Sequence, residues 1–78
     1  MEVDRDVEVS RAEVVDGVLH ARLRRDRSLP GAGTVTVARL PEGAVLRLAG
    51  KVITGRADGD RSVLDVPDGP AVDLVGGA

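Results

Sequence analysis

Apolar and polar residues alternate along much of this chain, which is the pattern of strands that bury one face. The clearest run extends from Val18 to Arg25, where Leu19, Ala21 and Leu23 alternate with polar residues. Similar runs predict further strands at residues 3–9, 34–40, 44–49, 51–56, 62–66 and 71–75. The first of these is expected to be a half-buried strand, with its odd-numbered valines on the buried face and the acidic residues between them on the face towards solvent.

Residues 10–16 allow two interpretations. Ser10 and Glu13 have the spacing of a helical capping box. However, Val14 and Val15 followed by an Asp-Gly pair are typical of a strand that ends in a hairpin turn, and we favour the hairpin. The sequence therefore predicts an all-β fold of about seven short antiparallel strands, in one domain over residues 1–78. Residues 61–78 are expected to add strands or to form a tail.

Composition bears on how such a fold is stabilised. The chain has fourteen valines and eight leucines, but no aromatic residue and no cysteine. A single core in so short a chain contributes about 3–5 kcal/mol, and disulfides, a metal or association usually supply the rest. Disulfides are excluded, and a single histidine argues against a structural metal site. We therefore expect a homo-oligomer without a cofactor. No apolar run approaches the ~20 residues of a membrane span and no signal peptide is apparent, so we expect a cytoplasmic protein with no membrane partner.

Charge is unevenly distributed along the chain. Residues 1–20 and 57–78 are mainly acidic, whereas residues 21–56 hold eight bases and two acids. This pattern predicts either a face for an anionic ligand or complementary charge between neighbouring subunits. Arginine pairs well with phosphate and carboxylate groups. The candidate surface for RNA or a small anion consists of Arg22, Arg24, Arg39 and Arg47. RNA binding would have to proceed without aromatic stacking platforms.

The catalytic inventory is small, and we expect no enzymatic activity. There is no cysteine or tyrosine, and His20 is expected to be a solvated surface residue. Gly31-Ala32-Gly33 precedes a predicted strand and lacks a phosphate-loop motif, so we discard it as a phosphate site. The acidic residues of 58–68 fit turns better than a calcium site. Gly76-Gly77 resembles the end of ubiquitin-like carriers, although a frayed tail is the interpretation we favour.

Residues 13–60 resemble the family of the trp RNA-binding attenuation protein (TRAP). The resemblance rests on Asp16-Gly17-Val18, on residues 33–40, and most closely on residues 45–59, where apolar alternation surrounds glycines. It implies a β-sandwich subunit of about seven strands that pairs edge to edge into a ring. Arg47 aligns with a basic RNA-contacting position of the family. The family's tryptophan-holding residues align here with Arg24, Pro41 and Ala44, so tryptophan sensing is not implied.

Together these observations predict a non-enzymatic, ring-forming, TRAP-like binding protein that uses an Arg-rich face for RNA or a small anion. One alternative is a structural self-assembly or protein-interaction module without a ligand. A third possibility is a ubiquitin-like carrier with a C-terminal Gly-Gly.

Overall fold

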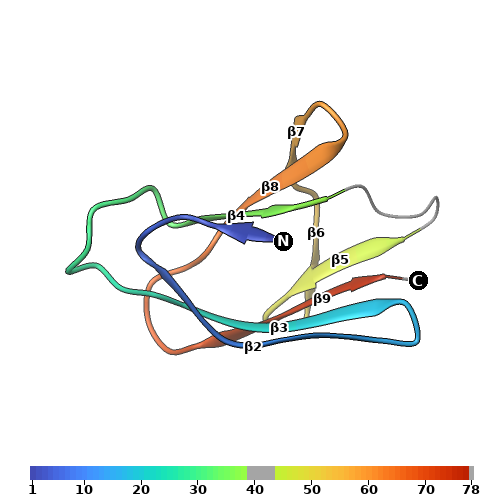
Figure 1. Ribbon diagram of the computed structural model, residues 1–78, viewed down its shortest axis with the longest axis horizontal. Helices are drawn as coiled ribbons and strands as arrows, with labels where there is room; N and C mark the ends of the chain where they lie inside the picture. The colour runs from blue at the N-terminus through green and yellow to red at the C-terminus, as the bar shows by residue number, and fades with distance from the viewer. Residues whose placement is uncertain (39–43, 78) are drawn as a thin grey trace.

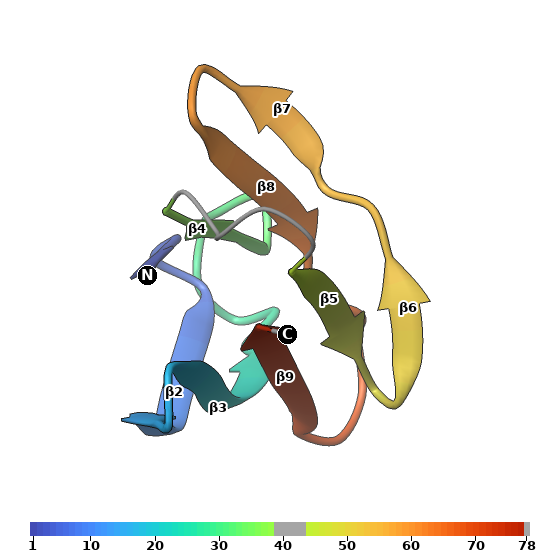
Figure 2. The same cartoon turned by 90° about the vertical axis from the view of Figure 1, so that its right-hand side faces the viewer.

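The computed structural model describes residues 1–38 and 44–77, which form nine strands in two antiparallel sheets (Figure 1). The four-stranded sheet contains, in spatial order, β1 (Glu2–Val3), β4 (Thr34–Val37), β8 (Arg61–Asp65) and β7 (Arg56–Asp58). The five-stranded sheet contains β2 (Val7–Val15), β3 (Val18–Arg25), β9 (Val72–Gly77), β5 (Val45–Leu48) and β6 (Lys51–Ile53). Figure 2 shows the two sheets on opposite sides of the molecule. The predicted all-β class is confirmed, and the described residues contain no helix that could span a membrane.

The strand count exceeds the predicted seven because two stretches interpreted as single strands each pass from one sheet to the other. Residues 3–9 divide into β1 and β2, and the chain crosses between the sheets at Asp4–Asp6. Residues 51–56 divide into β6 and β7 at Thr54 and Gly55. The hairpin after residue 15 is confirmed, since Val15 pairs with Val18 across the turn.

The core lies between the sheets and is made of small aliphatic side chains. Alternate residues of β3, β4 and β5 point into it, as the sequence pattern predicts. Its ten buried apolar residues are Val7, Ala21, Leu23, Val35, Val37, Leu46, Leu48, Leu64, Val66 and Leu74. The core is therefore assembled from both sheets and both ends of the chain.

The last strands hold interior positions in both sheets. β8 lies between β4 and β7, and β9 lies between β3 and β5. Gly76 is buried in β9, where it is opposite Leu19 on one side and Leu46 on the other. The expectation of a frayed end at Gly76-Gly77 was therefore wrong, because both glycines belong to the sheet.

Candidate functional site

Three of the four arginines predicted to bind an anion share one surface. Arg22 and Arg24 alternate with buried residues of β3, and Arg47 does the same in β5. Arg22 is opposite Asp73 of β9 and Arg47 is opposite Val75, so all three side chains leave the five-stranded sheet on the side away from the core. We call this side the outer face. The fourth residue, Arg39, lies outside the described residues.

Carboxylates alternate with these arginines on the outer face. Arg24 donates to Glu8 from Nη2 at 2.7 Å and from Nε at 3.2 Å, and this hydrogen bonding raises the arginine pKa. Asp73 is directly opposite Arg22, and Glu13 is directly opposite His20. The outer face therefore carries charges of both signs and is not a continuous basic patch.

Much of the charge segregation seen in the sequence is satisfied within one chain. Among the described residues, five ion pairs connect its acidic ends to its basic middle: Asp6–Arg25, Glu8–Arg24, Asp65–Arg56, Asp68–Arg27 and, at 3.9 Å, Asp68–Arg25. The Asp65–Arg56 pair uses both carboxylate oxygens, at 3.2 and 2.9 Å, and it lowers the pKa of Asp65. Four arginines of the basic middle, Arg24, Arg25, Arg27 and Arg56, are therefore paired with carboxylates of the same chain.

Asp6 is the one buried charged side chain among the described residues, with 1% of its surface exposed. Its Oδ2 accepts from Arg25 Nε at 3.1 Å, and its Oδ1 accepts from the Gly33 backbone N–H at 3.0 Å. Nearby, Asp4 Oδ2 accepts from the Ala32 N–H at 2.8 Å, which is the main cause of a lowered Asp4 pKa. These N–H groups of the glycine-rich loop thus bind carboxylates of the same chain, in keeping with our rejection of a phosphate site there.

His20 borders a small depression of about 100 Å³ on the outer face. The residues that line it are Arg11, His20, Ala21, Asp73, Leu74 and Val75. Within residues 1–38 and 44–77, no hydrogen bond joins His20 to a serine. The same residues contain no group of three histidine or acidic side chains that could hold a metal ion. The depression therefore offers no nucleophile–base pair.

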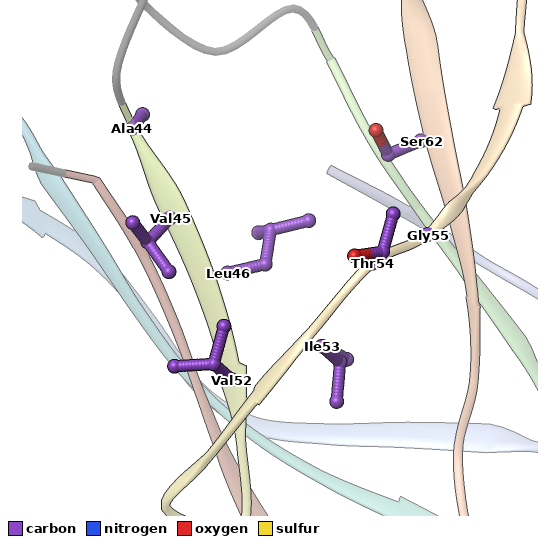
Figure 3. A pocket seen from close by; sticks show the side chains of 8 residues that line it. All are labelled: Ala44, Val45, Leu46, Val52, Ile53, Thr54, Gly55 and Ser62. Carbon is purple, nitrogen blue, oxygen red and sulfur yellow. The ribbon is translucent and has the colours of Figure 1, made fainter.

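A larger groove of about 420 Å³ opens where the chain passes from β6 to β7. Its lining residues are Ala44, Val45, Leu46, Val52, Ile53, Thr54, Gly55 and Ser62. Figure 3 shows Leu46 near its centre, with Val45 and Val52 on one side of it and Thr54, Gly55 and Ser62 on the other. None of the lining side chains titrates near neutral pH, so the groove is suited to apolar contact and not to acid–base chemistry.

Sequence reasoning missed the outer edge of β2. This nine-residue strand is the longest among the described residues, it has only β3 as a neighbour, and all of it except Val7 is exposed. Val14 points to the core side of the sheet, opposite Leu19, yet it is 68% exposed because none of the described residues covers it. The two-residue turn could have indicated this long strand, because such a turn pairs the residues before it with the whole of the strand Val18–Arg25 after it.

Comparison with known protein families, curated proteins and solved structures finds no match to this chain. The resemblance to the TRAP family therefore stays a prediction.

Proposed function

We propose that this protein is a non-enzymatic β-sandwich subunit that functions by associating with copies of itself. The observation that supports this proposal is the free edge of β2, a nine-residue strand that pairs with β3 on one side only, with a bulge between Val9 and Arg11. Such an edge exposes a row of backbone N–H and C=O groups that favour pairing with another strand. Of the functions considered from the sequence, a self-assembly module fits this edge best.

The small core supports the same proposal. Ten buried aliphatic residues without an aromatic side chain leave little stability to spare. Val9 and Val14 are exposed on the core side of β2 and add apolar surface that a neighbouring subunit would remove from water. Two closed forms are possible. A TRAP-like ring would pair β2 of each subunit with β6 of the next, whereas a two-fold dimer would pair β2 with itself.

Native mass spectrometry of the full chain, combined with size-exclusion chromatography over a range of concentrations, tests the proposal. We expect a closed oligomer for the natural sequence and a monomer for Val14→Pro. The proline removes an N–H that we expect to point to the free edge, so the β2–β3 hairpin should survive. The matched control is Glu13→Pro, whose N–H is expected to point towards β3, and this variant should lose the hairpin itself. A natural chain that is monomeric at every concentration would overturn the proposal.

Anion binding on the outer face is a second candidate function. Among the described residues Arg22 and Arg47 form no ion pair, and they share a face with Arg24. Single-stranded RNA or inorganic polyphosphate would be the probe, titrated at low and high salt. Binding that weakens with salt and is reduced in Arg47→Ala would support this candidate. Equal affinity at both salt concentrations would exclude it.

A further inference from the structure

We infer that the partner of β2 is the same strand of a second copy, antiparallel to it, with a two-fold axis at Ala12. This inference rests on the proposed self-association and specifies its geometry. The result would be one continuous sheet of ten strands, formed from the two five-stranded sheets. Figures 1 and 2 show β2 at the margin of the sheet, with no described strand beyond it.

Strand length favours two copies of β2 over a ring. The opposite edge of the same sheet is β6, which has only the three residues Lys51–Ile53. The edges of the other sheet, β1 and β7, have two and three residues. A head-to-tail contact would therefore leave most of β2 unpaired. Among the sheet edges formed by residues 1–38 and 44–77, only that of a second β2 matches this length.

The direction of the backbone groups limits which residues can be paired. Val15 and Val18 close a two-residue turn in which Asp16 and Gly17 have positive φ values of 51° and 77°, as in a type I′ hairpin. Residues of an antiparallel pair direct their N–H and C=O groups alternately towards and away from each other. Counting back from Val15, we expect the groups of Val14 and Ala12 to point to the free edge.

Charge then selects one register. Arg11 and Glu13 both lie on the outer face, because they are opposite Arg22 and His20, and they form an exposed ion pair with each other. An axis at Ala12 places Arg11 opposite Glu13 of the second copy, and Glu13 opposite the second copy's Arg11. Opposite charges directly across two strands are stabilising and like charges are destabilising.

The neighbouring registers are unfavourable for the same reason. An axis at Arg11 would put two arginines opposite each other, and an axis at Glu13 would put two glutamates opposite each other. An axis at Val14 would avoid this repulsion but would pair fewer residues of β2, because the turn begins after Val15. The small side chain of Ala12 also allows close approach at the axis. The segment from Arg11 to Glu13 is thus complementary to itself in one arrangement.

A single-cysteine scan identifies the axis directly, because the chain has no cysteine of its own. In Ala12→Cys the two Cα atoms would lie about 5.5 Å apart, which a disulfide can bridge. In the matched control Val14→Cys they would lie about 13 Å apart along the strands, which is too far. We expect mild oxidation to yield a covalent dimer of Ala12→Cys and almost none of Val14→Cys. Efficient cross-linking of Arg11→Cys would instead indicate an axis at residue 11, and efficient cross-linking of Glu13→Cys would indicate an axis at residue 13.

Charge reversal provides an independent test. Arg11→Glu places glutamates opposite each other at two points, and we expect the dimer dissociation constant to rise at least about ten-fold. The double variant Arg11→Glu with Glu13→Arg exchanges the two charges within each chain and should restore the natural affinity. Charge reversal of Asp65, which pairs with Arg56 far from β2, is the control and should leave association unchanged.

The outcomes separate this inference from the proposed function. A natural chain that remains monomeric overturns both. An oligomer that cross-links most strongly at a position other than residue 12, or one that the double variant does not restore, overturns the register while self-association stands. A closed ring of many copies also excludes the two-fold pairing but leaves the proposed function intact.

Discussion

Replacing Asp6 with alanine should remove a large part of the stability of this fold. The carboxylate is 1% exposed and accepts two hydrogen bonds, from the Arg25 guanidinium and from the Gly33 N–H. Alanine would leave the arginine without its buried partner and the N–H without an acceptor. Removing one partner of a fully buried ion pair destabilises proteins by about 3–5 kcal/mol. We expect a loss near the lower end of that range, because Arg25 is 28% exposed and keeps Asp68 at 3.9 Å.

That loss is large for a domain of this size. A chain of 78 residues is expected to have a free energy of unfolding of roughly 4–12 kcal/mol, at about 0.05–0.15 kcal/mol per residue. Asp6→Ala should therefore be only marginally stable if the natural chain lies near the lower end of that range, and clearly destabilised if it lies near the upper end. Asp6→Asn keeps a carbonyl that can accept from the Gly33 N–H, so its loss should be smaller.

Urea denaturation followed by far-ultraviolet circular dichroism is the suitable assay, because without aromatic residues the chain has no intrinsic fluorescence. The matched control is Asp65→Ala, which removes an exposed carboxylate that pairs with Arg56 through both oxygens. Surface ion pairs contribute little, so this variant should unfold close to the natural chain. The reasoning is refuted if Asp6→Ala and Asp65→Ala shift the urea midpoint equally.

Three other measurements follow from the same contacts. Leu74 is fully buried, so Leu74→Ala should lower the unfolding free energy by about 2–5 kcal/mol in urea denaturation. Gly33→Ala should also lower the melting temperature, because Gly33 has a φ of 67° and a Cβ there would collide with the Arg25 guanidinium. The hydrogen bond from the Ala32 N–H lowers the Asp4 pKa from its ordinary value of 3.8. The ionised Asp4 carboxylate therefore stabilises the fold fully at pH values above 3.8, and this stabilisation is lost as the pH falls through the lowered pKa. Acid titration of Asp4→Asn should show a weaker fall in stability over that range.

The alternation of residues predicted the strands well but could not predict how they are shared between two sheets. Val18–Arg25 was identified as a strand with the correct buried face, since that depends only on neighbours in sequence. The placement of β9 between β3 and β5 depends on contacts such as Leu19 with Gly76. Pairings between residues so far apart in sequence leave no local pattern. Sheet order was therefore beyond the reach of sequence reasoning.

The candidate site, like the fold, could be predicted where it depends on neighbours within one strand and not where it depends on the order of strands in the sheet. Arg22 and Arg24 share a face because they are two residues apart in one strand, and this was predicted. Arg47 was predicted to share this surface, and the structure places it there because β9 lies between β3 and β5, an order of strands that was not predicted. Asp6 was expected to face solvent because it alternates with valines, but it is buried where the chain crosses between the sheets. A period-two pattern fails at such a crossing because neither face there is a sheet face.

The separation of acidic and basic residues along the chain now has an explanation that requires no ligand. Strands from the acidic ends lie beside strands from the basic middle, as in Glu8 with Arg24 and Asp65 with Arg56. Charge that is already paired within a subunit contributes little to capture of an external anion. Arg11 and Glu13 differ from these pairs, because they lie on one free edge and their order permits an equivalent pairing with a second copy. Arg11 and Glu13 therefore support the proposed association through β2, whereas the pairs between the acidic ends and the basic middle are complete within one chain.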